Sequence, residues 1–299
     1  LVKGFSVYGL DNLNSYYSVD LKKQRLEILK KYENFQFEKV DISNKELLDS
    51  IFKKNNFTFI FHLAAQAGVR YSFSNPQVYV DSNIIGFINI FECCKENNID
   101  KVFYASSSSV YGDSKDLPLS ESSSTNPISF YGTTKKINET LADSYYKLYN
   151  INSLGLRFFT VYGPWGRPDM AYYIFTKKML NSKTIDVYNK GKHSRSFTYI
   201  DDLTKSVSLL FEEFSNNSNF FDIINIGGNE KIQLHKFIKI IESLTNCTAD
   251  INYLPKQDGD VKDTYSDCMK IDSIINYQPK TDIEEGLSLF LDWYLEYIK

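Results

Sequence analysis

Two hydrophobic periods alternate along the first half of the chain. Short apolar runs predict strands near 35–40, 57–63, 101–107 and 152–158, and apolar positions at helical spacing predict helices near 20–31, 43–55, 77–97 and 131–150. This alternation is typical of an α/β fold with a doubly wound parallel sheet. Because ligands of open parallel sheets lie beyond the carboxyl ends of the strands, we look for the site at those ends.

The regular alternation stops after residue 158, where Gly163, Pro164, Gly166 and Pro168 predict a loop. Segments 170–188, 194–199 and 249–267 predict a smaller mixed α/β lobe, whereas 201–214 and 223–226 resemble one more helix and strand of the sheet. We therefore expect a sheet domain over 1–169, completed by about 200–226, and a second lobe made mainly of 170–199 and 227–299. Helical apolar spacing in 282–298 is explained by core packing.

The first residues suggest a chain that starts inside a fold. Residues 1–4 look like a helix end, and Phe5–Gly9 looks like a buried strand that reaches Asp11. A dinucleotide-binding unit begins with a strand and a Gly-rich turn, followed about 20 residues later by an acidic residue. Asp11 fits the acidic position, so we expect the strand and the turn to precede Leu1.

Composition narrows the function to small-molecule chemistry. The 299 residues are 42% hydrophobic, which is enough for a globular core, and the net charge of −3 gives no basic patch for nucleic acid. No apolar run has the roughly 18 residues of a membrane helix. The four cysteines lack metal-ligand spacing, so we expect reduced structural cysteines, no metal site and a cytoplasmic protein.

A Ser-rich strand end and a helix start carry the candidate chemistry. Ser107 ends the predicted strand, and Tyr131 and Lys135 lie four residues apart on one face of the helix that follows. A free tyrosine has a pKa of about 10, and a nearby ammonium stabilises its phenolate. With a hydroxyl from Ser107, the set predicts a proton-transfer site. Tyr-x-x-x-Lys alone occurs by chance in many helices, so the Ser-rich strand end is the discriminating feature.

With these residues in view, the chain resembles the extended short-chain dehydrogenases/reductases of the nucleotide-sugar epimerase group, and more narrowly the UDP-glucuronate 4-epimerases. The resemblance covers nearly the whole chain. It rests on long strings that begin at Asp11-Asn12-Leu13-Asn14, His62-Leu63-Ala64-Ala65-Gln66-Ala67-Gly68-Val69-Arg70, Arg157-Phe158-Phe159-Thr160-Val161-Tyr162-Gly163-Pro164-Trp165-Gly166-Arg167 and Phe197-Thr198-Tyr199-Ile200-Asp201-Asp202.

The resemblance implies an isomerase with a Rossmann-type domain that binds NAD and a lobe that binds a UDP-sugar. Tyr131 would act as the base at the sugar C4 hydroxyl, Lys135 would also bond the nicotinamide ribose, and Ser107 would position the reacting oxygen. The implied cofactor-binding residues are Asp11, Asn12, Asp41, Ile42, Ala64, Ala65, Gln66, Tyr131 and Lys135. Close packing is an alternative explanation of the two alanines. Relatives also imply a homodimer formed through 77–97 and 131–150.

For the substrate, the resemblance implies hydroxyl donors that hold the sugar carboxylate, and an arginine on the diphosphate. The implied substrate-binding residues are Arg70, Ser108, Ser109, Thr160, Arg167, Tyr188, Arg195, Gln257 and Asp260. Turn capping is an alternative role for the serines. Ser108-Ser109 replaces the acidic pair of related dehydratases and so favours epimerisation over elimination. The family usually has Pro at position 258 and Asp at position 196, where this chain has Asp258 and Ser196.

Three alternatives stay open at this point. A 4-epimerase for UDP-glucose or UDP-N-acetylglucosamine would keep every catalytic residue. A UDP-glucuronate decarboxylase would share the substrate, although its segment after the catalytic hydroxyl carries a glutamate. A non-catalytic nucleotide-binding scaffold would explain a missing Gly-rich turn.

Overall fold

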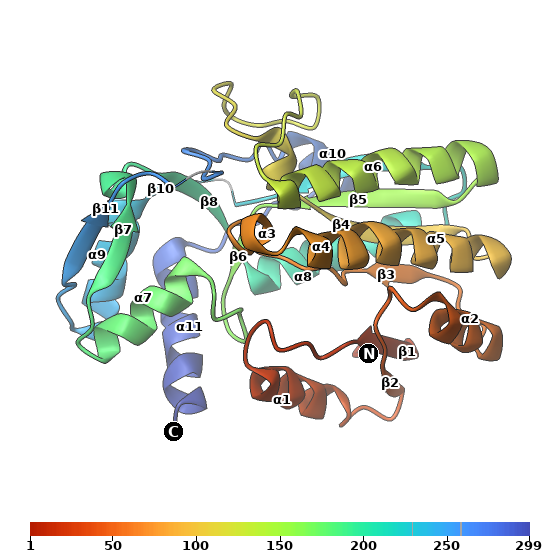
Figure 1. The fold of residues 1–299 in the computed structure, drawn as a ribbon, viewed down its shortest axis with the longest axis horizontal. Helices are drawn as coiled ribbons and strands as arrows, with labels where there is room; N and C mark the ends of the chain where they lie inside the picture. Colours follow the sequence, from red (N-terminus) through yellow and green to blue (C-terminus); the bar gives the residue numbers. More distant parts are fainter. Residues whose placement is uncertain (229, 258) are drawn as a thin grey trace.

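The structure is a computed structural model that describes residues 1–228, 230–257 and 259–299. Figure 1 shows a parallel sheet layered between helices, and beside it a smaller lobe built around α9 (Leu234–Thr245) and α11 (Ile283–Tyr297). The predicted α/β class with parallel sheets is therefore confirmed.

The main sheet has four parallel strands in the order β3-β4-β5-β9. Its strands are β3 (Ile60–His62), β4 (Lys101–Ser107), β5 (Asn152–Phe158) and β9 (Phe221–Ile226). Successive residues of β4 point to opposite faces: Val102 and Tyr104 pack in one apolar cluster and Phe103 in another. Both faces are buried, as expected of a parallel sheet.

Helices cover the two faces separately. The cluster around Tyr104 is closed by α2, α5 and α6, and the cluster around Phe103 by α8 and α10. The helices of this domain are α1 (Val19–Leu29), α2 (Lys45–Lys54), α3 (Tyr71–Ser74), α4 (Pro76–Tyr79), α5 (Gly86–Glu96), α6 (Phe130–Tyr149), α8 (Ile200–Phe214) and α10 (Met269–Ile275). A 3-10 turn, η2 (Ser108–Tyr111), follows β4 directly.

The first strand differs from its prediction. β1 (Val7–Asp11) pairs with β2 (Phe35–Lys39), and within the described residues it has no partner on its other edge. The expectation of a buried strand over Phe5–Gly9 is wrong, because Phe5 is 53% and Val7 36% exposed. One paired edge leaves these apolar side chains without the neighbours that a central strand has.

The helix predicted over 77–97 is interrupted. A π-helical segment, η1 (Val80–Ile85), lies between α4 and α5. Asn83 lies in this segment and is almost fully buried. Its side chain bonds the backbone of Gln66 at the end of the β3 segment and the Thr134 hydroxyl on α6. Sequence periodicity alone does not reveal such a segment.

The second lobe has its own core. It contains α7 (Ala171–Leu180), η3 (Asn189–Gly191), α9, α11, a three-stranded sheet and a two-stranded sheet. The strands are β6 (Thr160–Tyr162), β7 (Ile185–Tyr188), β8 (Ser194–Tyr199), β10 (Lys231–Gln233) and β11 (Ile251–Leu254). Side chains such as Phe237 and Phe290 pack there with less than 2% exposure. Across the described part of the chain, no helix is long and apolar enough to cross a bilayer.

Candidate active site

A cavity of about 1500 Å³ lies between the sheet domain and the second lobe. It collects residues that are far apart in sequence, since the ends of β1, β3, β4 and β5 all open toward it. Seventeen of the nineteen predicted site residues line its wall, namely Asp11, Asn12, Ile42, Ala64, Ala65, Gln66, Arg70, Ser107, Ser108, Ser109, Tyr131, Lys135, Thr160, Arg167, Tyr188, Arg195 and Asp260. Asp41 and Gln257 are not among the wall residues.

The proton-transfer residues come from β4 and α6. Ser107 is the last residue of β4, and its Oγ accepts a hydrogen bond of 3.1 Å from the Ser109 amide, which shapes the turn. α6 begins just before Tyr131 because Ser129 caps it, accepting a 3.0 Å bond from Gly132. Lys135 is one helical turn further on, with its Nζ 6.0 Å from the centre of the Tyr131 ring.

Burial controls both ionisable groups. It raises the pKa of Tyr131, although the hydrogen bond with Ser107 and the positive charge of Arg167 act to lower it. Burial lowers the pKa of Lys135 to about 8. Desolvation outweighs the two lowering influences on the Tyr131 pKa, and the expected contribution of Lys135 is not among them. The Lys135 ammonium instead donates a 2.7 Å bond to the Ala105 carbonyl.

The predicted cofactor residues form a continuous edge. Asp11 ends β1, with its side chain half-exposed and 3.9 Å from the Lys22 ammonium. Asn12 donates a 2.8 Å bond to Asp41. Burial raises the pKa of Asp41, but the hydrogen bonds from Asn12 and Ser43 outweigh it and lower that pKa overall. Asp41, which does not line the cavity, thus fixes the side chain of Asn12, which does.

These residues fit a dinucleotide. An exposed carboxylate at the end of a strand, here Asp11, suits ribose hydroxyls, and the small side chains of Ala64 and Ala65 leave their backbone open to the cavity. Gln66 is fixed by Asn83, whose Oδ1 accepts a 2.7 Å bond from the Gln66 amide. Lys135 adds an ammonium beside this edge. In the described residues, no group of three or more His, Cys, Asp or Glu side chains could hold a metal ion.

Three hydroxyl residues and one arginine share the cavity wall with Tyr131. Ser108 and Ser109 begin η2, and Thr160 begins β6, so three hydroxyl residues from two elements share the cavity wall. Arg167 is held by Asp169, with 3.1 Å between Nε and Oδ1. Burial acts to lower the Arg167 pKa, but the Asp169 charge raises it overall, so this cation persists near Tyr131.

The end of the cavity in the second lobe carries two arginines. Arg195 donates bonds of 2.6 to 2.9 Å to the carbonyls of Ser194, Val261 and Lys262, which fixes the guanidinium in the wall. Arg70 lies 4.5 Å from the centre of the Tyr188 ring, and its Nη2 is 3.3 Å from an Asp260 oxygen. Tyr188 and Asp260, two of the implied substrate-binding residues, are thus both in contact with Arg70.

Three further positions named in the sequence analysis are Gln257, Asp258 and Ser196. Gln257 has a buried Oε1 with no hydrogen-bond partner in the described structure. Asp258 lies outside the described residues. Ser196, where the family usually has Asp, is fully buried and donates a hydrogen bond to the Gly228 carbonyl.

Some residues of the cavity wall were missed. Tyr16 bonds Asp169 at 3.1 Å, and Arg25 bonds the carbonyls of Trp165 and Gly166, so the segment after β1 reaches across to the loop before α7. Tyr16 belongs to the Tyr16-Tyr17 pair, which closely follows the family motif that begins at Asp11. Its nearness to this motif could have identified it as a residue of the site. Nothing in the local pattern around Arg25 distinguishes it from an ordinary helix-surface arginine.

A parallel sheet whose strand ends share one cavity with a Ser-Tyr-Lys set defines the short-chain dehydrogenase/reductase class of enzymes. The family model described as GDP-mannose 4,6 dehydratase matches residues 1–290. The chain therefore belongs to this family of NAD-dependent epimerases and dehydratases.

Relatives and solved structures agree with this assignment. Protein CapI of Staphylococcus aureus is 45% identical, over 99% of this chain and 93% of the relative. A UDP-glucuronate 4-epimerase of Thermodesulfobacterium geofontis (strain OPF15) is 40% identical, over 100% and 91%. A crystal structure of UDP-glucuronic acid 4-epimerase from Bacillus cereus with UDP-glucuronic acid and NAD superposes with a TM-score of 0.92 at 33% identity, covering 99% of this chain and 94% of that one. The resemblance read from the sequence is confirmed.

Proposed function

We propose that this protein is an isomerase that inverts C4 of a UDP-sugar, converting UDP-glucuronate to UDP-galacturonate through a transient 4-keto sugar. The observation that carries the proposal is the placement of Ser107, Tyr131 and Lys135 in one cavity with three further hydroxyl residues. The relatives named UDP-glucuronate 4-epimerase and the neighbour solved with UDP-glucuronic acid and NAD support the same substrate and cofactor.

The residues of the chain account for the proton movements. Tyr131 takes the proton from the C4 hydroxyl, and the hydrogen bond from Ser107 and the charge of Arg167 favour its anion. Bound NAD would accept hydride from C4 and return it to the opposite face. Lys135, held by the Ala105 carbonyl, keeps a donor beside the expected cofactor ribose. Tyr131 then returns its proton to the oxygen at C4, so the enzyme ends in its starting state.

The carboxylate needs restraint during this reaction. Once C4 is a ketone, the C6 carboxylate is β to it and tends to leave as carbon dioxide. We assign Ser108, Ser109 and Thr160 to hold the carboxylate near the sugar plane, where the breaking bond is not aligned with the carbonyl π system, and Arg167 to assist them. Without an acidic side chain at 108 or 109, the site lacks the general acid that elimination needs.

Thr160→Val tests the substrate and the restraint together. A hydrogen bond to a charged group contributes roughly 1.5–3 kcal/mol, so its loss should lower kcat/KM for UDP-glucuronate by roughly 10- to 100-fold, with a smaller effect on UDP-glucose. Decarboxylated UDP-pentose should also appear among the products. Mass spectrometry and NMR of the products measure both effects.

Thr140→Val is the matched control, because Thr140 is on the exposed side of α6 and its hydroxyl bonds only the Lys136 carbonyl in the described structure. Faster conversion of UDP-glucose or UDP-N-acetylglucosamine than of UDP-glucuronate by the unmodified protein would overturn the substrate proposal. If Thr160→Val leaves the substrate preference and the product purity unchanged, Thr160 does not restrain the carboxylate. The substrate proposal itself would stand.

We also propose a cytoplasmic homodimer. Its interface would use the helices within 77–97 and 131–150, which carry exposed apolar side chains such as Ile85, Leu148 and Tyr149. Light scattering coupled to size-exclusion chromatography tests this, and a monomer at micromolar concentration would contradict it.

A further inference from the structure

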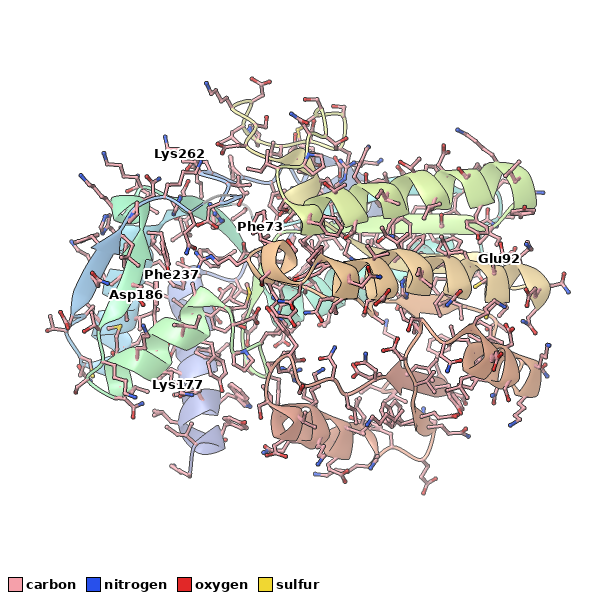
Figure 2. All side chains as sticks on the ribbon, in the orientation of Figure 1. Phe73, Glu92, Lys177, Asp186, Phe237 and Lys262 are labelled. Carbon is pink, nitrogen blue, oxygen red and sulfur yellow. The ribbon has the colours of Figure 1, made fainter. Side chains whose placement is uncertain are left out.

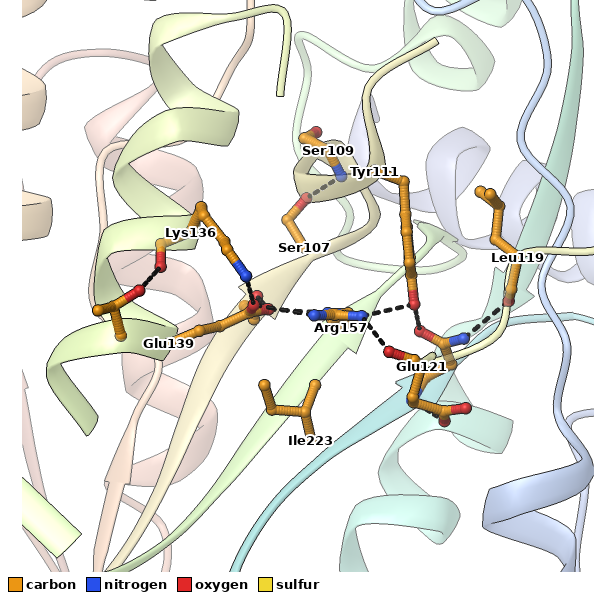
Figure 3. Close-up of polar contacts among 12 residues, drawn as sticks. Ser107, Ser109, Tyr111, Leu119, Glu121, Lys136, Glu139, Arg157 and Ile223 are labelled. Carbon is orange, nitrogen blue, oxygen red and sulfur yellow. Dashed lines mark hydrogen bonds and ion pairs between the residues drawn. The ribbon is translucent and has the colours of Figure 1, made fainter. Parts of the chain in front are cut away.

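A buried polar cluster lies directly behind the catalytic wall. Figure 3 shows the Arg157 guanidinium of β5 between Glu139 of α6 and Tyr111 of η2. Arg157 donates bonds of 2.8 and 2.9 Å to the two carboxylate oxygens of Glu139, and one of 2.9 Å to the Tyr111 hydroxyl. Tyr111 in turn donates a 2.6 Å bond to Asn225 of β9. Each of these four residues is at most 3% exposed, and none lines the cavity in the described structure.

This cluster is attached to both flanks of the serine turn. Ser106, immediately before Ser107, donates a 2.7 Å bond to Glu139. Tyr111 closes η2, which contains Ser108 and Ser109, and is fixed by Arg157 and Asn225. The segment that presents Ser107, Ser108 and Ser109 to the cavity is therefore bonded to the same ion pair at each end.

The same ion pair is attached to the helix that carries the base. Glu139 follows Tyr131 by eight residues and Lys135 by four, so the three side chains lie along one face of α6. The Glu139 carboxylate accepts hydrogen bonds from Ser106 on β4 and Arg157 on β5, and so connects this face of α6 to both strands. Ser107 and Tyr131 line the same cavity, and their relative placement depends on how α6 packs against the end of β4.

Apolar side chains could fill the volume that Glu139 and Arg157 occupy, and no charge would then be buried. Burying an ion pair costs desolvation that its attraction seldom repays, and well-packed apolar substitutes are often as stable. Burial acts to lower the Arg157 pKa, but the Glu139 carboxylate outweighs it and raises that pKa, so the pair stays ionised. The pair of hydrogen bonds between a guanidinium and a carboxylate contributes geometry rather than stability. Because this arrangement is planar and bidentate, it fixes the orientation of both side chains.

We infer that Glu139, Arg157, Tyr111 and Asn225 are positioning residues that hold the Ser107–Ser109 turn in register with Tyr131. The inference rests on the proposed epimerase function for its activity readout. None of the four lines the cavity in the described structure, so each would act through other residues. They act through Ser106 and η2 on the serines, and through α6 on Tyr131.

Tyr111→Phe is the decisive variant. It keeps the ring, whose centre is 4.7 Å from the Arg157 guanidinium carbon, and removes only the hydroxyl that links Arg157 to Asn225. We expect kcat to fall roughly 10- to 100-fold, as for a displacement near 1 Å in a reacting pair, while KM for UDP-glucuronate changes less than about threefold. The fraction of decarboxylated product should rise, because Ser108 and Ser109 are displaced with Ser107.

The matched control is Tyr277→Phe. Tyr277→Phe also removes a hydroxyl bonded to a buried polar side chain, here the carboxylate of Asp202, but this pair lies outside the cavity wall in the described structure. Arg157→Lys is a second test that keeps the charge and loses the bidentate geometry. Hydrogen exchange of the peptide over 105–112 gives a readout without turnover and should be faster in Tyr111→Phe than in Tyr277→Phe.

The outcomes separate the two claims. Failure of the unmodified protein to convert UDP-glucuronate overturns the proposed function and leaves the exchange measurement to decide the positioning role. A lower melting temperature in Tyr111→Phe, with kcat, product purity and exchange over 105–112 no more affected than in Tyr277→Phe, would make the cluster merely structural and overturn the inference.

Discussion

At the scale of single residues, burial acts on Tyr131 and Lys135 in opposite directions. It raises the pKa of the phenol and lowers the pKa of the ammonium to about 8. Near neutral pH the lysine therefore keeps its charge, and the tyrosine keeps its proton until charges in the cavity compensate for desolvation. Arg167 supplies one such charge from the wall.

Tyr131→Phe tests the base. The substitution keeps the ring and should leave cofactor and UDP-sugar binding intact, while turnover falls roughly 10²- to 10⁴-fold, the usual contribution of general acid–base catalysis. Steady-state kinetics and sugar-nucleotide binding measure the two effects. Tyr146→Phe on the same helix, where the ring stacks on Phe221, is the control and should leave turnover unchanged. Near-normal turnover of Tyr131→Phe would refute its assignment as the base.

Lys135→Met tests the buried ammonium through stability. Because the folded-state pKa of about 8 is below the usual 10.5, the unfolded chain binds more protons between these values, and the free-energy penalty of burying the lysine becomes smaller as pH rises. The free energy of unfolding of the unmodified protein, relative to Lys135→Met, should increase by about 2 kcal/mol from pH 7.5 to 9.5. Urea denaturation across this range measures it, and a difference independent of pH would show that Lys135 is not desolvated.

At the scale of elements, hydrophobic periodicity predicted β4, β5 and α6 to within a residue or two, because each buries a regular set of apolar positions. It did not predict η1, since a π-helical turn depends on where the Asn83 side chain finds partners. The sequence pattern did not predict the bonds between Arg157 and Glu139 either, because these residues come into contact only in the folded protein. The site residues were found mainly from long motifs, whereas Arg25 and Asn83 lie outside any motif.

Asn83→Ala tests η1 as the support of the cofactor edge. It leaves the buried backbone groups of Gln66 without partners, which should cost about 1–3 kcal/mol of stability. Bound NAD per protein chain should also fall, because the segment from Ala64 to Gln66 loses its fixed position. Asn152→Ala is the control: it removes a similar bond, to the Phe220 amide, outside the cavity wall. Equal NAD retention in the two variants would contradict this role for Asn83.

At the scale of the whole molecule, the cavity exists because the sheet domain and the second lobe contact each other on several sides. Figure 2 shows the side chains of both parts on the ribbon, and residues of both parts, such as Ser107 and Arg195, line the cavity. Arg25 reaches the loop at Trp165, and Arg70 reaches Asp260. A substrate bound there would contact β4 and α6 at its sugar and the second lobe at its nucleotide. Such a site can hold the diphosphate while the sugar turns over.

The fate of the hydrogen at C4 tests whether the protein inverts C4 by removing and returning one hydride. UDP-glucuronate carrying deuterium at C4 is incubated with the purified protein in ordinary water, without added NAD, and the product is examined by NMR and mass spectrometry. The account predicts UDP-galacturonate that retains the deuterium at C4, with no accumulation of NADH at 340 nm, because the hydride is removed and returned within one site. Loss of the deuterium to solvent, or stoichiometric NADH with an oxidised sugar, would contradict it.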